Sequence, residues 1–551
     1  MTASPSRAAL DRGIAALGAK NLPGAEAALR EALKAGEPAA EASFYLTAVL
    51  RALGRYDDAA DMARRSFAIS PLIETAYLGC EIAALRLDGA GALVWADRLQ
   101  HVKAKHLPRL VRAGDQFTSA ALYKAAARCF EIAATLAPDD VDLVRRQGYC
   151  EAIYDRPKAI RLLRAFAERH RRAPHLACLA LYVMLPYQEK ALRAARGLPP
   201  DGRDPGDLHF ALSGADFQAW RDAAAQWLAA APDSVDALQM MAMVRIAEGR
   251  SRDAEPYLER VRAQRIDLAA CAHFGKTFLA DAAAASHRLG ENLPAMEMLV
   301  DRAPQGPWVF MACDAIYFEK YGRAFARSFA LHAPRTHLHL HVFDIAPQDR
   351  DVFRMRLSTA LEGTSYSVST ETSGLAGTKD AACYYHAVRF IRLAALADTW
   401  PHPLCAFDAD MIFNRSPDLL FDWFEDADVG VALLTGRVEP SNQICANVLG
   451  IASTQAGRDY LRLTAGYLAL VRKRGILQWG MDQTAMFAVL EDMTSRGAAP
   501  RVTGVPLEVY EGAYAPGAIV WVGKGAPDDP NYAAFEARRK FLLEGFPPAT
   551  K

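Results

Sequence analysis

Two aspartates separated by one residue stand out among the apolar residues of the stretch 407–413. This stretch reads Phe-Asp-Ala-Asp-Met-Ile-Phe, and five of its seven residues are apolar, so Asp408 and Asp410 emerge from a segment that favours burial. Unpaired carboxylates in such surroundings are costly unless a cation or a bound proton compensates them. In a regular strand, residues i and i+2 share one face, so both carboxylates would converge on one ion. Such hard oxygen ligands suit Mg²⁺ or Mn²⁺, which often also bind substrate phosphates; the alternative is a solvated turn at a strand end.

The elements that must position these aspartates begin near residue 304, where the character of the sequence changes. Apolar, β-rich runs alternate there with helical patterns, and the runs lie at 308–314, 337–344, 404–413 and 429–434. Such alternation is typical of an α/β fold with a largely parallel sheet. Ligands of these sheets usually bind beyond the carboxyl ends of the strands, so acidic residues at strand ends are the first candidates for a site.

The first half of the chain carries a repeat of 33 or 34 residues. Small residues recur at this spacing at Ala25, Ala59, Ala92 and Ala126, and Ala254 follows Trp220 by 34. The pattern resembles the tetratricopeptide repeat, a pair of antiparallel helices that approach closely at the small residues. Prolines such as Pro71 and Pro138, each twelve positions after a small residue, stop the second helix. The register is looser at about 140–215, and the Gly/Pro-rich run 197–207 is expected to loop out.

The helical repeat in the first half and the alternating strand and helix patterns in the second half predict two domains. We expect a tetratricopeptide-like helical repeat domain with connecting helices at 1–300 and an α/β domain at 301–551. The repeats form either a spacer or dimerisation module, or a concave groove that binds a peptide or a partner protein. The sequence leaves both possibilities open.

Composition excludes several classes of protein. The 551 residues include 64 Lys and Arg and 64 Asp and Glu, so the net charge is zero. This balance gives no indication of binding to nucleic acid or to an anionic membrane. The nine cysteines are scattered without a C-x-x-C pair, which argues against a disulfide framework and a structural zinc site. The start of the chain does not read as a signal peptide and no stretch is apolar enough to be a transmembrane segment. We therefore expect a cytoplasmic protein.

The α/β half resembles the retaining GT-A glycosyltransferases, specifically the family-eight group that includes bacterial lipooligosaccharide galactosyltransferases and glycogenin. The resemblance covers about 308–525 and begins at 310–317, which is similar to the family's opening strand with its A-x-D-x-x-Y ending. It implies that Asp314 and Tyr317 hold the uridine of a nucleotide-sugar donor. Residues 341–344 match the family's second strand.

Two further motifs follow in the family's order. Residues 385–390, Tyr-His-Ala-Val-Arg-Phe, resemble the family's Y-x-R helix, which makes Arg389 a contact of the donor sugar or phosphate. The D-x-D motif is Asp408-Ala409-Asp410, and the resemblance implies that it holds Mn²⁺, or Mg²⁺, on the nucleotide diphosphate. The D-x-D motif is common by itself, so its place after a Y-x-R helix carries the likeness.

The last motif is similar to the family's D-Q pair beside the reacting sugar carbon. It lies at 480–483, where Asp482 would bind sugar hydroxyls and Gln483 would face the anomeric centre. Two departures stand out. The segment 445–451 replaces the family's usual Asn-Ala-Gly before V-L-x-I, and no histidine accompanies the late Gly-Lys, where the family has a third metal ligand. Lys524 remains there to pair with a leaving diphosphate.

The resemblance implies a mechanism and a catalytic pair. Breaking the donor's anomeric C–O bond places negative charge on the diphosphate, which an ion on Asp408 and Asp410, Lys524 and Arg389 would stabilise. The acceptor hydroxyl, on a protein or a glycan, would attack the same face of the sugar and lose its proton to the departing phosphate. Gln483 would support the oxocarbenium-like carbon, and Asp482 would orient the sugar beside it.

Three histidines that alternate along a predicted strand form a second cluster of chemical groups. His337, His339 and His341 would share one face of the strand at 337–344, as a metal site requires. That strand is an early one, away from the D-x-D motif. We therefore expect them to have a structural or surface role.

Two other classes of protein compete with a transferase. Phe-Asp-Ala-Asp after a strand also resembles the opening of haloacid-dehalogenase-type phosphatases, in which Asp408 would be a nucleophile and Asp410 a general acid. Those enzymes usually have Thr or Val where this chain has Ile412, and they carry the motif near the start of the domain. The third possibility is an adaptor whose transferase domain has lost turnover, a view that the missing late histidine favours.

Overall fold

The computed structural model describes most of the chain, and the described part forms two compact units. Residues 4–36, 39–195, 215–265, 272–291, 293–332, 334–434, 438–506, 509–511, 517–523 and 530–544 are described. The first unit comprises Met1–Ala191 and Gly214–Ala223, and the second comprises Leu192–Ser213 and Ala224–Lys551. The predicted loop at 197–207 lies outside the described residues. No helix among the described residues is both long enough and apolar enough for a membrane crossing.

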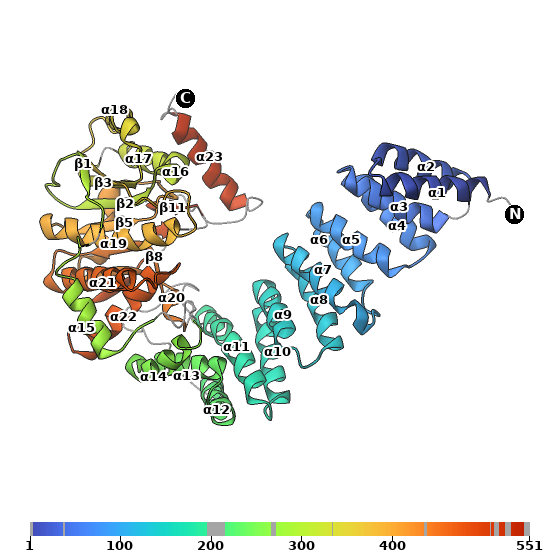
Figure 1. Cartoon of the computed structure of the whole chain (residues 1–551), viewed down its shortest axis with the longest axis horizontal. Helices are drawn as coiled ribbons and strands as arrows, with labels where there is room; N and C mark the ends of the chain where they lie inside the picture. The colour runs from blue at the N-terminus through green and yellow to red at the C-terminus, as the bar shows by residue number, and fades with distance from the viewer. Residues whose placement is uncertain are drawn as a thin grey trace. The chain divides into compact units, whose positions relative to one another are not determined.

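The first unit is built from consecutive antiparallel helices (Figure 1). Its helices are α1 (Pro5–Gly18), α2 (Leu22–Lys34), α3 (Ala39–Ala52), α4 (Tyr56–Ile69), α5 (Ile73–Leu85), α6 (Gly89–Asp97), α7 (Leu107–Ser119), α8 (Tyr123–Leu136), α9 (Val141–Tyr154), α10 (Arg156–Arg169), most of α11 (Pro174–Ala195) and the first part of α12 (Ala215–Ala230). Pro71 and Pro138 follow the ends of α4 and α8, as predicted.

The repeat period follows from the contacts within each helix pair. Ala25, Ala59, Ala92 and Ala126 lie on the second helices of successive pairs and are completely buried. A glycine on the first helix completes the contact in several pairs. A Cβ at Gly114 of α7, for example, would lie 2.7 Å from a ring carbon of Phe130 on α8. Only small residues allow this approach, so the predicted helical repeats are confirmed.

Helices α13 (Val235–Ala247), α14 (Ser251–Arg262) and α15 (Lys276–Ala285) belong to the second compact unit. The Ser251 hydroxyl of α14 donates to Glu491 at 2.6 Å, and Arg252 pairs with Asp492 at 3.0 Å. Both acceptors lie on α22 (Met481–Ser495). The compact units thus divide near residue 224. The domain boundary at 300 stays a prediction from the change in sequence pattern.

The second unit contains an eight-stranded sheet with the order β1-β4-β3-β2-β5-β8-β7-β9. The strands are β1 (Glu297–Val300), β2 (Trp308–Asp314), β3 (His337–Phe343), β4 (Tyr366–Glu371), β5 (Leu404–Phe407), β7 (Val429–Leu433), β8 (Ile444–Ile451) and β9 (Val502–Gly504). The run β4-β3-β2-β5 is parallel, as predicted. However, β1 and β8 are antiparallel to their neighbours, so the whole sheet is mixed.

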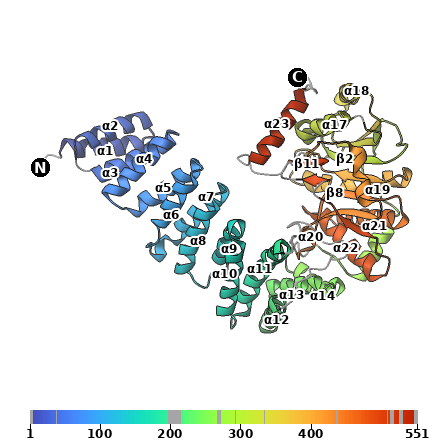
Figure 2. The same ribbon diagram turned by 180° about the vertical axis from the view of Figure 1, so that it is seen from behind.

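Helices cover both faces of this sheet (Figures 1 and 2). α17 (Arg323–Ala330) and α18 (Arg350–Ala360) pack on the face to which Val309, Met311 and Cys313 of β2 contribute. α19 (Ala381–Thr399) covers the opposite face, where Trp308 packs edge-on against Trp400 just after that helix. α21 (Gln455–Lys473) and α22 lie on the same side as α19. The burial of both faces explains why the predicted strands read as continuous apolar runs.

The predicted strand at 404–413 is not continuous, and this part of the prediction is wrong. β5 ends at Phe407, and β6 (Met411–Phe413) joins a smaller sheet of order β10-β11-β6. The other strands of that sheet are β10 (Tyr510–Glu511) and β11 (Val520–Val522). The chain changes sheets because β5 pairs with β2 and β8, whereas β6 pairs with β11. The D-x-D aspartates therefore lie in the break and not on a regular strand.

The three alternating histidines form a buried hydrogen-bonded ladder between β3 and β4. Each imidazole bonds to the hydroxyls of serines on the neighbouring strand at 2.7–2.8 Å, and the ladder comprises His337, Ser365, Ser367, His339, Ser369 and His341. All three histidines are buried. The hydroxyls satisfy five of the six ring nitrogens, which would otherwise be costly in a core, while His341 Nε2 lies 3.7 Å from Glu371 Oε2 without a hydrogen bond. Their expected structural role is confirmed.

This ladder predicts a loss of stability in mild acid. Burial lowers the pKa of His337 to about 4 and that of His341 to about 3, and it brings the pKa of His339 well below its ordinary value. In the unfolded chain the same rings take up protons below about pH 6.5. Because the unfolded state then binds more protons, the free energy of unfolding decreases as the pH is lowered. The decrease is up to about 1.4 kcal/mol per pH unit for each histidine.

Urea unfolding at pH 7, 6 and 5 measures this slope. His339→Gln keeps a hydrogen-bonding side chain but removes one titrating group, so its unfolding free energy should depend less steeply on pH. His287→Gln changes an exposed histidine of the same unit and serves as the control. An unchanged slope in His339→Gln would show that the ladder does not govern the acid sensitivity.

Candidate active site

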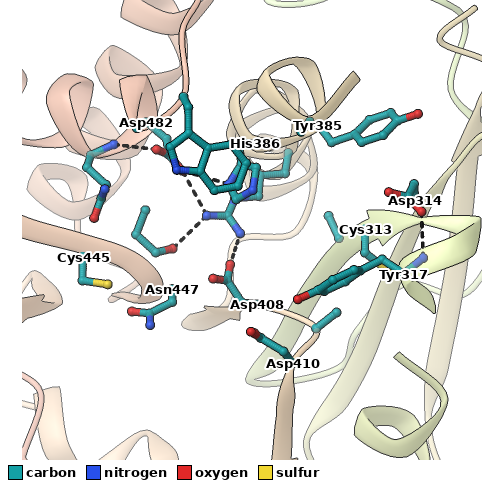
Figure 3. A pocket seen from close by; sticks show the side chains of 18 residues that line it. Cys313, Asp314, Tyr317, Tyr385, His386, Asp408, Asp410, Cys445, Asn447 and Asp482 are labelled. Atoms are coloured by element: carbon teal, nitrogen blue, oxygen red, sulfur yellow. Dashed lines mark hydrogen bonds and ion pairs between the residues drawn. The ribbon is translucent and has the colours of Figure 1, made fainter. Parts of the chain in front are cut away.

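Seven of the residues predicted to do chemistry line one cavity of about 430 Å³. They are Asp314, Tyr317, Arg389, Asp408, Asp410, Asp482 and Gln483. β2 ends at Asp314 and β5 ends just before Asp408; because these neighbouring strands are parallel, both aspartates emerge at the same edge of the sheet. Figure 3 shows Asp314 and Tyr317 at one end of the cavity and Asp482 at the other, with Asp408 and Asp410 between them.

The first end of the cavity is built by the turn that follows β2. Asp314 accepts a hydrogen bond from the Tyr317 N–H at 2.7 Å and so caps α16 (Ala315–Tyr317). The Tyr317 ring packs against Tyr321, with centroids 4.8 Å apart. Burial raises the pKa of the Tyr317 phenol, and the Asp410 carboxylate, to which the phenol is hydrogen-bonded, raises it further. The phenol is therefore a proton donor at neutral pH.

Arg389 links the middle of the cavity to its second end. This buried side chain of α19 pairs through Nη1 with Asp408, and its Nη2 lies 3.1 Å from Asp482 Oδ2 and 3.0 Å from the Ala446 carbonyl oxygen. Burial lowers the pKa of Arg389, but Asp408 and Asp482 outweigh burial and raise it above its ordinary value. Both Nη atoms contact protein acceptors, so the contact with a donor that the sequence predicts for Arg389 stays a prediction.

The second end of the cavity is formed by the first turn of α22. Gly480 adopts φ of +79° just before this helix, a conformation that costs glycine little. Asp482 is buried, and it accepts a hydrogen bond from the Gln483 N–H at 2.9 Å and lies 3.6 Å from His386 Nδ1. Burial raises the pKa of Asp482, but His386 and Arg389 outweigh burial and hold it below its ordinary value. Asp482 is therefore an anion at neutral pH.

Asp408 and Asp410 are the candidate metal ligands of the cavity. Within the described part of the chain, no group of three or more His, Cys, Asp or Glu side chains could hold a metal ion. The described residues therefore provide the two carboxylates of the D-x-D motif, of which Asp408 is shared with Arg389. Two carboxylates do not make a closed structural site. They do fit Mg²⁺ or Mn²⁺ that takes its other ligands from substrate phosphates and water.

The segment that precedes Lys524 is tied to the D-x-D motif. The Gly523 N–H donates to the Asp410 carbonyl oxygen at 2.7 Å, and β11 pairs with β6 immediately before it. Lys524 itself lies outside the described residues, so its pairing with a diphosphate stays a prediction.

Other side chains that line the cavity were not predicted as site residues. Those that are aromatic or polar, or that carry a thiol, are Cys313, Tyr385, His386, Cys445, Asn447 and Trp479. Helix geometry could have indicated Tyr385 and His386, because residues three and four positions before Arg389 lie on the same side of α19. Tyr385 donates to Asp344, an aspartate with φ of +57° that directly follows β3. No sequence signal marks Trp479, apart from its position beside the Gly-Met-Asp-Gln motif.

Comparisons with known proteins give distant structural likenesses only. No family model matches the chain, and no curated protein sequence matches it. A crystal structure of MamA protein is 15% identical, covering 30% of this chain and 92% of its own, with a TM-score of 0.24. The galactosyltransferase LgtC, in complex with donor and acceptor sugar analogs, is 14% identical, covering 44% of this chain and 98% of its own, with a TM-score of 0.31. The bifunctional glycosyltransferase WbbM is 16% identical, covering 43% and 44%, with a TM-score of 0.27.

The fold class rests on the topology given above, because these TM-scores are all below 0.5. The chain is a tetratricopeptide-like helical array followed by a mixed α/β domain. In this domain the parallel run β4-β3-β2-β5 continues into antiparallel β8, and a D-x-D motif leaves the main sheet for a smaller one. The fold class predicted from the sequence is confirmed.

Proposed function

We propose that this chain is a metal-dependent glycosyltransferase that transfers a sugar from a nucleotide-sugar donor, with retention of the anomeric configuration. The observation that carries the proposal is the convergence of seven predicted site residues on one cavity at the carboxyl ends of β2 and β5. They come from four separate stretches of the sequence. A cavity of about 430 Å³ is also within the range of small-molecule sites.

The order of residues along the cavity suits a nucleotide diphosphate and its sugar. The nucleoside, proposed to be uridine, lies against Asp314 and the ring of Tyr317. The diphosphate lies by Asp408 and Asp410, and the sugar lies at the Asp482 end, where an anionic carboxylate accepts hydroxyl hydrogen bonds. This order is the one that the family resemblance implies for the same residues.

The ion proposed for this site is Mn²⁺ or Mg²⁺, held by Asp408 and Asp410. When bound, it would neutralise charge on the diphosphate and so make the nucleotide a better leaving group. Arg389 positions Asp408, because its guanidinium pairs with that carboxylate. Lys524 is proposed to add a second positive charge.

Transfer then breaks one C–O bond and forms another on the same carbon. The bond between the anomeric carbon and the phosphate oxygen breaks with both electrons going to the diphosphate. The acceptor hydroxyl oxygen forms the new bond, and its proton passes to the departing phosphate oxygen. Asp482 holds the sugar hydroxyls, and Gln483 presents its amide dipole to the carbon that becomes electron-poor.

The acceptor is proposed to be a protein or a glycan that the repeat unit selects or positions, either directly or through a partner protein. Concave helical repeats commonly bind extended ligands, which supports this division of labour. The cytoplasmic location stays a prediction from the sequence.

Release of free nucleotide from a panel of nucleotide-sugars tests the proposed function. We expect at least one donor, most readily a UDP-sugar, to be hydrolysed slowly, because water can take the place of the acceptor. This hydrolysis should require Mn²⁺ or Mg²⁺ and should stop when EDTA removes the metal. An aryl phosphate should remain intact. Hydrolysis of the aryl phosphate with Mg²⁺ would favour a phosphatase. Absence of both hydrolysis and thermal stabilisation by every donor would favour an adaptor.

A further inference from the structure

We propose that Trp479 is the platform on which a pyranose ring of a saccharide acceptor stacks, so that the acceptor is a glycan. The inference rests on the proposed function and extends it to the acceptor class. Its starting point is the exposure of one indole. All eight tryptophans of the chain are described; seven are buried or half-buried, whereas Trp479 is 57% exposed. This exposed indole lines the candidate active site, where a bound ligand can cover it.

Trp479 is held in place at the rim of the cavity. It precedes Gly480, whose positive φ turns the chain into α22, and the Met481 N–H donates to the Gln478 carbonyl at 3.2 Å. The imidazole of His386 packs edge-on against the indole, with centroids 4.1 Å apart. The indole is therefore positioned before any ligand binds, which lowers the entropy cost of stacking.

The platform lies at the sugar end of the cavity. His386, which contacts the indole, also lies 3.6 Å from Asp482, and Asp482 occupies the end opposite Asp314 and Tyr317 (Figure 3). A nucleoside bound at Asp314 and Tyr317 is therefore at the far end from Trp479. The indole is instead beside the place where the transferred sugar meets its acceptor.

The chemistry around the indole suits a pyranose. A pyranose has a face of C–H groups that packs on an aromatic ring and a rim of hydroxyls that form hydrogen bonds. The cavity supplies both, because Trp479 provides the apolar face while Asp482, Gln483 and Asn447 provide polar groups. The small aliphatic side chain of a serine or threonine in a flexible peptide presents no such face, so an indole platform would add little to its binding.

Intrinsic fluorescence tests the platform without requiring turnover. Methyl pyranosides and the disaccharides lactose, maltose and cellobiose are titrated into the full-length protein. Trp479 is the exposed tryptophan, so its emission should respond when a ligand covers the indole. We expect at least one of them to change the emission, with no change from sorbitol, an open-chain polyol. The change should disappear in Trp479→Phe. Lack of any response to the saccharides, or an equal response in Trp479→Phe, would overturn the proposal.

Steady-state kinetics separate the acceptor from the donor. With a saccharide acceptor, Trp479→Ala should raise the acceptor KM at least about tenfold and Trp479→Phe should raise it less, because a smaller ring keeps part of the stacking. The donor KM should shift by less than about threefold. Phe541→Ala is the matched control, since Phe541 is 59% exposed on α23 (Pro530–Glu544), away from the cavity.

Two results would reject the platform in this assay. One is an acceptor KM within twofold of wild type in Trp479→Ala, and the other is transfer to an unstructured peptide but to no saccharide. If the wild type releases nucleotide from no donor, the proposed function fails, and the fluorescence titration alone then decides whether Trp479 binds sugars.

Discussion

Asp410→Asn is expected to lower metal-dependent release of nucleotide from the preferred donor at least about a hundredfold. The substitution removes one of the two carboxylates proposed to hold the ion, while the amide oxygen can still accept from Tyr317. Asp410 is a cleaner test than Asp408, because Asp408 also pairs with buried Arg389 and its loss would leave that cation undercompensated. Nucleotide release and the Mn²⁺-dependent shift in unfolding temperature measure the effect.

The stability of the metal-free protein provides an internal control for this variant. Asp410→Asn removes one of two neighbouring anions, so the metal-free protein should unfold at the same temperature as wild type or slightly above it. The exposed aspartate Asp422, changed to asparagine in the same unit, should affect neither readout. If Asp410→Asn retains a tenth or more of the activity with the same metal requirement, the ion is not held as proposed.

The largest effect on stability is expected from Arg389→Met. This substitution leaves the Asp408 and Asp482 carboxylates without their shared cation inside the protein, and breaking such a buried pair typically costs about 3–5 kcal/mol. The unfolding temperature of the variant should fall by about 10 °C. Activity should be lost as well, because Asp408 loses the contact that fixes its orientation.

A double variant identifies the cause of that loss. Asp482→Asn in the Arg389→Met background removes one of the two carboxylate charges that are left without a cation. The double variant should therefore regain part of the stability, although its activity stays low. Arg354→Met is the matched control, because Arg354 pairs with Asp351 at 2.9 Å on the surface and such pairs are worth little. A loss below 1 kcal/mol in Arg389→Met, or no recovery in the double variant, would mean that Arg389 does not support the site through these carboxylates.

Local patterns predicted much of the fold, and pairing over long distances set the limits. Buried small residues at a fixed period predicted the repeats, because each marks a close approach between neighbouring helices. The break after Phe407 could not be predicted, since β6 pairs with β11, a strand more than a hundred residues further along the chain. The contacts of Ser251 and Arg252 with α22 have no local signal either, so α13 and α14 read simply as further repeats.

The candidate site was predicted where motif and burial coincide. Asp408 and Asp410 were found because carboxylates are unusual in an apolar run, and the family resemblance supplied Asp314, Tyr317, Asp482 and Gln483. The double pairing of Arg389 was not predicted, because its two carboxylates come from a loop and from a helix that follow later in the chain. The exposure of Trp479 could not be predicted either, since tryptophan is normally buried.

Anomalous scattering from crystals of the full-length protein grown with UDP and Mn²⁺ tests the central claim most directly. The account predicts a manganese peak in contact with the carboxylates of Asp408 and Asp410, with the uracil and ribose against Asp314 and Tyr317. A cavity that stays empty at saturating UDP and Mn²⁺, or a nucleotide bound elsewhere on the chain, would contradict it.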